Sequence, residues 1–298
     1  MKEKKGKLAR KEAREGYLYA LPWFIGFTVF TAGPIIASFL LSFTNWDLIR
    51  PAEWIGFGNY NTLLEDPLFW QSLKVTSIYA LFSVPLGILG GLAIAVLMNQ
   101  KIKGLSVFRT IYYLPAVVSG VAVSLLWSWI FNPDFGVLNY LLSLIGINGP
   151  GWIYDEKWAL PSLIIMSLWG VGGGMVIYLA GLQGVPTELY EAAIIDGASS
   201  WRRFWSITIP MISPVIFFQL IMGIIGSFQI FTQAYIMTGG GPNNATLFYV
   251  LYLYRNAFQW FKMGYASALA WVLFIVILIL TIIQFKLANR WVYYEGGK

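Results

Sequence analysis

The sequence predicts an all-α, polytopic membrane protein with six transmembrane helices, and three observations support this fold class. Of its 298 residues, 58% are hydrophobic and 11% are charged, and the mean hydropathy is +0.66, outside the usual range for a soluble domain. Six apolar runs are long enough to cross a bilayer, which takes roughly 20 residues. The 14 Trp and 17 Tyr mostly flank these runs, as expected of side chains at the head-group level.

Each predicted span is an apolar run without charged residues in its interior. Gly33-Pro34 interrupts the first span, and Pro210 and Pro214 lie early in the fifth, which is tolerated where neighbouring helices satisfy the freed carbonyl groups. Another apolar stretch, Ala245–Tyr254, is too short to span, and we expect it to lie externally at the membrane interface. The six predicted spans are Tyr17–Phe43, Leu73–Leu97, Phe108–Phe131, Leu160–Leu182, Ile207–Met237 and Ala266–Phe285.

The basic residues predict that both termini are cytoplasmic. Residues 1–16 form a basic tail, and the apolar run that follows is much longer than the core of a secretory signal, so we expect a retained anchor. We place the six-span region at 17–287 and a cytoplasmic C-terminal tail at 288–298. Most basic residues then lie inside, as the positive-inside rule requires; these are Lys2, Lys4, Lys5, Lys7, Arg10, Lys11, Arg14, Lys101, Lys103, Arg109, Arg202, Arg203, Lys286, Arg290 and Lys298.

The composition excludes several classes of function. The chain has no Cys and no His, which removes disulfides, thiolate nucleophiles, imidazole bases and the common zinc and copper ligand sets. It has no G-x-x-x-x-G-K-[ST] motif and therefore no P-loop for ATP. The net charge of +6 is scattered between apolar spans, which argues against a nucleic-acid partner. We predict a chain that is not an enzyme and binds no metal or cofactor itself.

Glycines are concentrated in two of the spans. The pair in the second span has the small-xxx-small spacing, which we interpret mainly as close helix packing. The patch in the fourth span follows a tryptophan and suits either a tight helix crossing or a ligand passage near the bilayer centre; the sequence leaves both open. The residues are Gly87 and Gly91 in the second span, and Gly170, Gly172, Gly173 and Gly174 in the fourth.

The cytoplasmic loop between the fourth and fifth spans, residues 184–210, predicts a short helix. Pro186 and Thr187 favour a helix start, Glu188 suits the positive end of the helix dipole, and Gly197 supplies the left-handed conformation that ends a helix. A second short helix around Arg202 would lie along the inner leaflet, because two arginines stand there among three aromatic residues. Pattern alone fits a solvated amphipathic loop equally well.

A motif in this loop favours a functional helix over a solvated loop. Glu191-Ala192-Ala193, Asp196-Gly197-Ala198, Ile207 and Pro210 closely resemble the EAA box in permeases of binding-protein-dependent ABC importers. Other segments are similar to carbohydrate-uptake permeases of the maltose and glycerol-3-phosphate type, and most similar to the first of the two permeases. Unlike the enterobacterial maltose permease, the chain has no large external domain and no extra N-terminal spans. These segments are Leu40–Asp47, Ile55–Tyr60, Asp66–Trp70, Phe108–Pro115 and Thr238–Pro242.

The resemblance implies a type I ABC importer permease-like fold in the bacterial plasma (inner) membrane. The implied partners are a second homologous permease, two ATPase subunits, an extracytoplasmic solute-binding protein and a sugar, besides the surrounding lipid. ATP and Mg would be bound by the ATPase. In the family the loop helix is the coupling helix, which sits in a cleft of the ATPase. The residues assigned to coupling are Glu188, Glu191, Ala192, Ala193, Asp196, Gly197, Ala198 and Pro210.

The resemblance also implies that substrate is bound by the spans on either side of the EAA box, about midway across the bilayer. Trp169 could offer an aromatic platform, and Ser227 and two glutamines could hydrogen bond to a sugar, although core packing is the commoner role for any one of them. The predicted pathway residues are Met166, Trp169, Gly170, Gly173, Gly226, Ser227, Gln229, Ile230 and Gln233.

Other functions are possible alternatives to a sugar permease. Ion-coupled carriers usually need an ionisable residue inside a span, and the span interiors here have none. A membrane scaffold or sensory subunit that binds an ATPase without passing solute would share the loop. Glycerol phosphate or another charged solute would need a cationic pocket, and the sequence shows no basic residue deep in the spans, so a neutral saccharide is preferred unless a partner supplies the charge.

Overall fold

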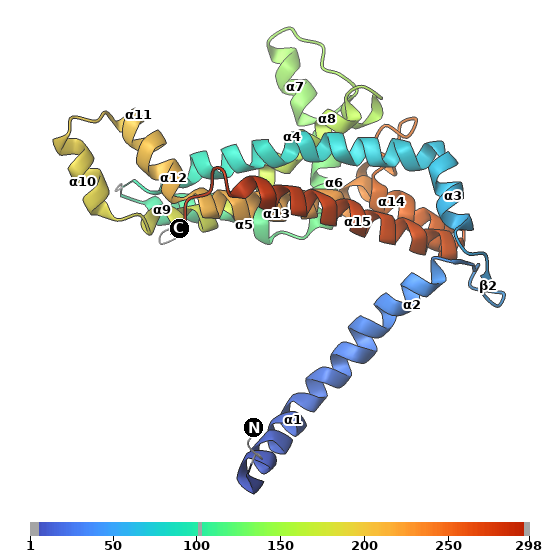
Figure 1. The fold of residues 1–298 in the computed structure, drawn as a ribbon. Coiled ribbons are helices and arrows are strands. Elements are labelled where there is room, and N and C mark those ends of the chain that lie inside the picture. The colour runs from blue at the N-terminus through green and yellow to red at the C-terminus, as the bar shows by residue number, and fades with distance from the viewer. Residues whose placement is uncertain (1–5, 101–102, 295–298) are drawn as a thin grey trace. The chain divides into compact units, whose positions relative to one another are not determined.

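The computed structural model of the chain describes residues 6–100 and 103–294. Its internal contacts divide the chain into two units, which are described separately. The first comprises the chain up to Glu65 together with Arg255–Trp271, and the second comprises Asp66–Tyr254 together with the residues from Val272 onward. Nearly all described elements of both units are helices, which confirms the all-α prediction (Figure 1).

The first unit begins with a long apolar helix that continues through a proline. It consists of α1 (Lys7–Phe27), the π-helical turn η1 (Thr28–Ala32) and α2 (Gly33–Leu41). Pro34 has no N–H, and its ring would clash with the carbonyl four residues earlier. The helix widens before it, so that the N–H of Gly33 donates to the carbonyl of Thr28, five residues back. The predicted interruption is therefore a π-bulge and not a break.

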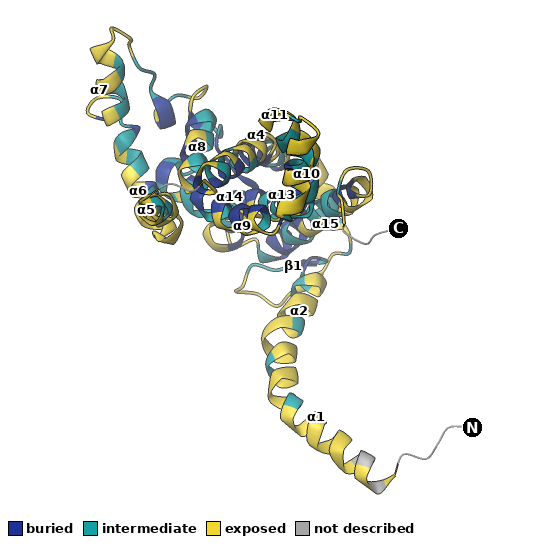
Figure 2. Cartoon of the chain, turned by 90° about the vertical axis from the view of Figure 1, so that its left-hand side faces the viewer, coloured by how far each residue is buried: buried dark blue, intermediate teal, exposed yellow. Residues whose placement is uncertain are grey.

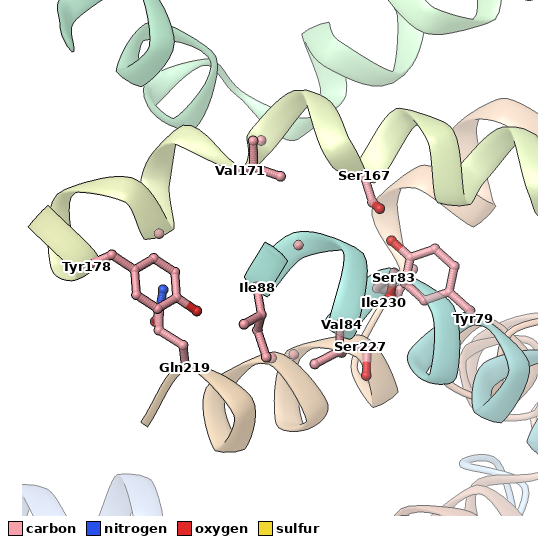
Figure 3. Close-up of a pocket in the computed structure, with 15 residues that line it drawn as sticks. Tyr79, Ser83, Val84, Ile88, Ser167, Val171, Tyr178, Gln219, Ser227 and Ile230 are labelled. Atoms are coloured by element: carbon pink, nitrogen blue, oxygen red, sulfur yellow. The ribbon is translucent and has the colours of Figure 1, made fainter. Parts of the chain in front are cut away.

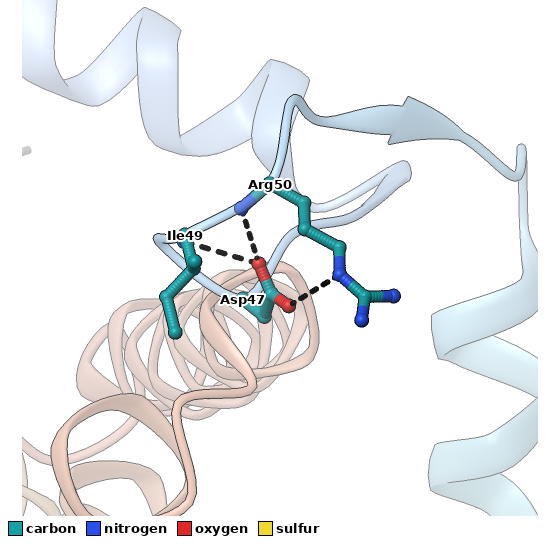
Figure 4. Close-up of polar contacts among 3 residues, drawn as sticks. All are labelled: Asp47, Ile49 and Arg50. Atoms are coloured by element: carbon teal, nitrogen blue, oxygen red, sulfur yellow. Dashed lines mark hydrogen bonds and ion pairs between the residues drawn. The ribbon is translucent and has the colours of Figure 1, made fainter.

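A small hairpin with a capped turn follows. β1 (Thr44–Asn45) pairs antiparallel with β2 (Glu53–Trp54). In the loop between them, the Asp47 Oδ1 accepts hydrogen bonds from the backbone N–H groups of Ile49 at 3.1 Å and Arg50 at 2.8 Å, and the Arg50 Nε lies 3.9 Å from the other carboxylate oxygen (Figure 4). The backbone of the turn is thus satisfied by one carboxylate.

Polar anchoring and a close backbone approach hold the rest of this unit together. In α3 (Gly58–Glu65), the Asn59 amide donates to the carbonyls of Ser42 and Thr44, both at 2.9 Å. The π-helix η6 (Arg255–Gln259) and the start of α15 (Met263–Ala288) complete the unit. A Cβ on Gly264 would lie 2.0 Å from the Thr44 carbonyl oxygen, so only glycine lets α15 start against the hairpin.

The second unit is organised around its longest helix, α4 (Pro67–Met98), whose 32 residues span about 48 Å at 1.5 Å per residue. Its start is well specified, because the Asp66 side chain accepts the Leu68 N–H at 2.9 Å and Pro67 occupies the first turn. Four helices pack against α4: α8 (Ala159–Ser167), α9 (Gly172–Gln183), α13 (Ser213–Phe228) and α14 (Tyr249–Tyr254) (Figure 1).

Three predicted spans are bent helix pairs. α5 (Leu105–Val117) meets α6 (Gly120–Ile130) at 98°, and the helix ending in the 3-10 turn η3 (Leu168–Gly170) meets α9 at 46°. The segment of α11 (Ser200–Arg203), η4 (Phe204–Thr208) and α12 (Ile209–Met211) meets α13 at 63°. Within the described ranges, three helices are long and apolar enough to cross a membrane, and six spans result if each bent pair counts as one. These six correspond to the six predicted spans.

The bend before α13 has an identifiable cause. Pro214 has no N–H and its ring displaces the carbonyl of Pro210. The Ser213 hydroxyl donates to that carbonyl at 2.6 Å, and the Ser213 Oγ in turn accepts a hydrogen bond from the Tyr293 N–H at 2.8 Å. The Ser213 side chain thereby replaces the lost helical hydrogen bond, and the C-terminal segment holds that side chain in place.

Two details of the predicted spans are wrong. The fifth was expected to reach Met237, but α13 ends at Phe228, and the chain then re-forms a separate π-helical turn, η5 (Ala234–Thr238). The stretch Ala245–Tyr254 was expected at the membrane interface, but α14 is buried against α4, with Leu251 fully buried and the Tyr249 N–H donating to Thr76 Oγ1 at 2.9 Å. An apolar helix without a polar face gains more from burial on all sides.

The segment between α6 and α8 is closed by one asparagine. It contains α7 (Val137–Leu144) and the 3-10 turn η2 (Trp152–Tyr154). The Asn139 amide nitrogen donates to the carbonyls of Pro133 at 3.0 Å and Pro150 at 3.2 Å, and its oxygen accepts the Trp152 Nε1–H at 2.6 Å. The Asn139 amide nitrogen and oxygen are thus both hydrogen bonded, which holds the two ends of this segment together.

The core of the second unit lies between α4, α9 and α13, where Figure 2 shows the buried residues gathered. One cluster there comprises Leu92, Ala95, Met98, Met175, Tyr178, Leu179, Leu182, Val185 and Ile212. α9 also crosses α5 at very short range, because a Cβ on Gly172 would lie 1.7 Å from the Tyr112 carbonyl oxygen. Gly170, two residues earlier, has nothing within 4 Å of its Cβ position.

We expect Gly172→Ala to destabilise the protein by about 1–3 kcal/mol, because the added methyl group forces α5 and α9 apart. The measurement is the melting temperature of the detergent-solubilised chain, which should fall by several degrees. Gly170→Ala is the matched control, since the same change meets open space; equal losses in both variants would contradict the close crossing.

The carboxyl group of Asp47 should titrate at acid pH. The backbone N–H of Arg50, then that of Ile49, favours the carboxylate and lowers the pKa of Asp47 from its ordinary value of 3.8. A lowered folded-state pKa means that the contribution to stability is present above the unfolded pKa and is lost as the pH falls through the folded one. Carboxyl carbon NMR of the full chain in nanodiscs, assigned with Asp47→Asn, should give a midpoint below 3.8; a midpoint at or above that value would contradict this turn geometry.

Candidate functional site

Two adjoining cavities lie in the second unit, where the helix pair α8–α9 bends. Their volumes are about 330 and 250 Å³. Both are lined by Tyr79 of α4, Ser167 and Gly170 at the bend, and Ile230 just after α13. The helix α4, the bend between α8 and α9, and the segment after α13 therefore meet at one place (Figure 3).

The larger cavity has polar groups from three helices. At one end the Tyr79 hydroxyl interacts with the side chains of Ser167 and Ser83 (Figure 3). Ser227 of α13 lies at the same end, with its hydroxyl donating to the Ile224 carbonyl at 2.8 Å. At the other end lie Tyr178 and Gln219, and the wall between the two ends is apolar. Among the residues that the structure describes, no Asp, Glu, Lys or Arg lines either cavity.

The glycines divide between packing and open space. Gly91 lies under the ring of Tyr178, and a Cβ added to Gly91 would lie 3.1 Å from that ring. Gly172 touches α5. Gly87, Gly170 and Gly226 have nothing within 4 Å of their Cβ positions and line the cavities. The tight helix crossing applies to Gly172, whereas Gly87, Gly170 and Gly226 leave room beside the backbone; the ligand passage stays a prediction.

Most of the predicted pathway residues meet at these cavities. Gly173 instead packs near Ala116 of α5, and Gln229 is exposed and lines neither cavity. Trp169 borders the smaller cavity and makes an edge-to-face contact with Trp127 at 5.9 Å. The residues brought together are Met166, Trp169, Gly170 and Gln233 at the smaller cavity, and Gly170, Gly226, Ser227 and Ile230 at the larger one, with Ile230 shared.

Sequence reasoning missed the polar residues contributed by α4. Tyr79 and Ser83 line the larger cavity one helical turn apart, and polar residues at this spacing in an otherwise apolar span were the available signal. Ser167, Tyr178 and Gln219 were not predicted either, because the resemblance implied other positions on the same helices. The larger cavity thus uses the second, fourth and fifth predicted spans together, and the smaller one also uses the third, through Pro115, Val118, Gly120 and Val123.

The loop after α9 forms the expected helix with a well-defined end. α10 (Thr187–Ile195) is preceded by Pro186 and has Glu188 in its first turn. Gly197 has a φ of +75°, its N–H donates to the Ile194 carbonyl at 3.0 Å, and the Ala198 N–H donates to the Ala193 carbonyl at 2.9 Å. This pair of bonds is a Schellman motif, which explains the predicted requirement for glycine.

α10 presents an apolar and acidic surface with no covering element in the described parts of the chain. None of its residues is buried, and Ile195 is 86% exposed. Glu188, Glu191 and Asp196 are exposed, and no ion pair involves them within the described residues. Ala192 and Ala193 lie between these carboxylates, and their small side chains leave room for another surface to approach the helix closely. Apolar side chains exposed in this way beside unpaired charges are typical of an interaction surface.

α10 is fastened to the base of the bent helix pair that follows. The hydroxyls of Tyr190 and Thr208 lie 2.8 Å apart, which joins the middle of α10 to η4. The partly buried Tyr190 also packs on the core cluster, together with Ile207. Pro210 lies one turn further on, at the bend that leads into α13. Tyr190 thus joins α10 both to η4 and to the core cluster.

Next to this joint is an exposed aromatic and basic segment, α11 and η4, as predicted. Trp201 and Trp205 are 72% and 52% exposed, with ring centres 5.6 Å apart. A recess of about 260 Å³ lies between this segment and the end of α10, lined by Ala193, Asp196, Ala198, Arg202, Arg203, Ser206 and Ile207. The loop is therefore a folded unit and not an extended connector.

Comparison with known proteins places residues 83–293 in the family described as binding-protein-dependent transport system inner membrane component. The "Probable ABC transporter permease protein YesP" of Bacillus subtilis (strain 168) is 45% identical over 298 residues, 98% of this chain and 96% of that protein. The lactose transport system permease protein LacF of Rhizobium radiobacter is 38% identical over 283 residues, 92% of this chain and 94% of that protein.

A solved structure has the same fold. The crystal structure of a bacterial alginate ABC transporter, in complex with an alginate pentasaccharide-bound periplasmic protein, contains a chain that matches with a TM-score of 0.83. The sequences are 25% identical, and the match covers 96% of this chain and 98% of that one.

The contact between α10 and η4 can be measured directly. We expect Tyr190→Phe and Thr208→Val each to lower the free energy of unfolding by about 0.5–1.5 kcal/mol, because each removes one partner of a largely desolvated hydrogen bond. The double variant should lose less than the sum, which a double-mutant cycle on detergent-solubilised protein would show. Tyr140→Phe on α7 is the control for the loss of a tyrosine hydroxyl elsewhere; additive losses would contradict the contact.

Proposed function

We propose that this chain, which belongs to the family of binding-protein-dependent transport system inner membrane components, forms half of the pathway by which an ABC importer takes up a neutral sugar or oligosaccharide. The observation that carries the proposal is the combination in one unit of an uncharged, hydroxyl-lined cavity between bent helices and an exposed helix, α10, fastened to one of those bends.

The cavity supports a sugar as the solute. Sugars are bound by a few hydrogen-bonding groups together with apolar or aromatic surface, and the cavities offer Tyr79, Ser83, Ser227 and Trp169 in this role. The named relatives LacF and the alginate transporter point to lactose and to an acidic polysaccharide, respectively. Because no charged side chain lines the cavities here, a neutral saccharide suits this chain better than alginate or a glycerol phosphate.

The loop supports coupling to a separate ATPase. The exposed face of α10, with Glu188, Glu191 and Asp196 available for basic partners and Ala192 and Ala193 giving close access, would sit in a cleft of an ATPase subunit. That subunit would bind ATP and Mg. Gly197 and Ala198 end the helix, and Pro210 lies at the bend that would receive its movement.

The mechanism follows from the path of contacts. When the ATPase subunits close around ATP, α10 would move as a rigid body, since its two ends are fixed by Pro186 and the Schellman motif. The Tyr190–Thr208 contact would pass the movement to α12. The bend at Ile212 would then change the position of α13 at the cavity, which is the two-state element that alternating access needs.

The assembly and topology belong to the same proposal. Six spans supply half of a pathway, so a second homologous permease, two ATPase subunits and an external solute-binding protein would complete the importer. The chain would lie in the bacterial plasma (inner) membrane with residues 1–16, the loop 184–210 and residues 288–298 on the cytoplasmic side, where the basic residues concentrate.

The test is labelled-sugar uptake into proteoliposomes that contain this chain with its partner permease, ATPase and binding protein. Glu191→Ala and Gly197→Asp should lose most ATP-dependent uptake, because one removes a carboxylate at the ATPase contact and the other strains the left-handed residue that ends α10. Membrane insertion is checked on the same samples.

Gly146→Asp provides a matched control. Gly146 has a φ of +76° and ends α7 with the same pair of backbone bonds, from Gly146 to Ser143 and from Ile147 to Leu142. The strain is therefore equal, but the helix lies outside the loop, so uptake should persist. Normal transport by the two loop variants would refute the coupling role, and uptake without ATP would refute the class of importer.

A further inference from the structure

The end of the larger cavity at Tyr178 and Gln219 has a polar group without a partner. Tyr178 is 1% exposed, and its hydroxyl has no hydrogen-bond partner among the described residues. Apolar side chains of the core cluster, among them Leu92, Met175 and Ile212, surround this part of α9. A buried hydroxyl normally finds a partner, so this one is either a cost without purpose or a group whose partner arrives from outside the chain.

The surroundings of this hydroxyl favour the second interpretation. Tyr178 and Gln219 both line the cavity, and Figure 3 shows them together at one end, opposite Tyr79. Two glycines leave room for them: a Cβ on Gly91 would lie 3.1 Å from the Tyr178 ring, and a Cβ on Gly174 would lie 2.7 Å from Nε2 at the flexible end of the Gln219 side chain. The backbones of α4 and α9 are thus cleared to seat these two polar side chains at the cavity wall.

The positions of Tyr178 and Gln219 along their helices show which end of the cavity lies nearer the cytoplasmic loop. Tyr178 stands six residues before Gly184, where the cytoplasmic loop begins, and Gln219 stands six residues after Ser213, where α13 begins; each distance is about 9 Å along a helix. Tyr79, Ser83 and Ser167 form the opposite end, and Val84, Ile88 and Val171 lie between the two ends.

We propose that Tyr178 and Gln219 form a second, cytoplasm-side binding position for the transported saccharide, reached after it leaves the position at Tyr79 and Ser227. The Tyr178 hydroxyl would donate to a sugar hydroxyl, and the Gln219 amide can both donate and accept. The inference rests on the proposed function. A movement of α9 or α13 that widens this end would bring the hydroxyl to the sugar, so passage supplies the missing partner.

The pair is uncharged and can make few hydrogen bonds, which defines what it recognises. A neutral pyranose presents hydroxyls that both donate and accept, whereas a carboxylate or phosphate would find no cation here. The cavity of about 330 Å³ is at the lower end of the range for ligand sites, roughly 300–1,000 Å³. A saccharide would therefore meet this position with one end first, and not as a whole chain.

Tyr178→Phe tests the proposal because it removes only the hydroxyl. In the reconstituted importer, we expect it to slow the initial uptake of whichever labelled neutral sugar the natural protein carries by about two- to tenfold, the effect of one lost hydrogen bond. Gln219→Leu should act in the same direction. The melting temperature of Tyr178→Phe should be unchanged or higher, since no hydrogen bond within the described chain is lost.

Monodeoxy analogues of that sugar separate binding from a general effect. For the natural protein, uptake should fall for the analogue that lacks the contacted hydroxyl, and for Tyr178→Phe that analogue and the parent sugar should be taken up alike. Tyr140→Phe on α7 is the control and should keep the natural discrimination. Unchanged uptake of all sugars by Tyr178→Phe, or an equal loss for all of them, would overturn the inference and leave the proposed function intact. Absence of any sugar uptake by the natural protein would overturn both.

Discussion

A bilayer offers no water to backbone groups, so every interruption of a spanning helix has to be satisfied by the protein itself. In this chain one of these interruptions lies at the candidate site. Ser213 supplies the hydrogen bond that Pro214 removes, a π-bulge absorbs Pro34, and a 3-10 turn at Leu168–Gly170 carries the bend beside the cavities. The breaks at Pro214 and Pro34 are therefore compatible with helices that cross a bilayer.

The fold class and the number of spans could be predicted from the sequence because both depend on the length and apolarity of runs, which lipid imposes directly. The α10 helix and its end could be predicted as well, since Pro186 and Gly197 act through local backbone geometry. The bends of 98°, 46° and 63° could not. A bend depends on which side chain takes over a lost hydrogen bond and on what holds that side chain, and here Ser213 is held by Tyr293, which lies far away in sequence.

The candidate site shows the same division. Gly170, Ser227 and Ile230 were found because a resemblance pointed to their helices, but Tyr79, Ser83 and Gln219 were not, since polar residues in an apolar span give no direct sign of which cavity they line. The burial of α14 was missed for a related reason: ten apolar residues suit an interface and an interior equally well until a partner such as Thr76 is known to receive the first N–H group. Periodicity describes one helix, whereas a cavity is a property of several.

The bond between Tyr293 and Ser213 also matters for handling the protein. It places a residue near the end of the chain on the oxygen that repairs the bend into α13, so material fused behind Lys298 starts only a few residues from the hinge. An affinity tag or fluorescent protein attached there would tether a bulky, mobile load to the joint between α10 and the cavity. The design of a fusion at this end of the chain is therefore part of the experiment.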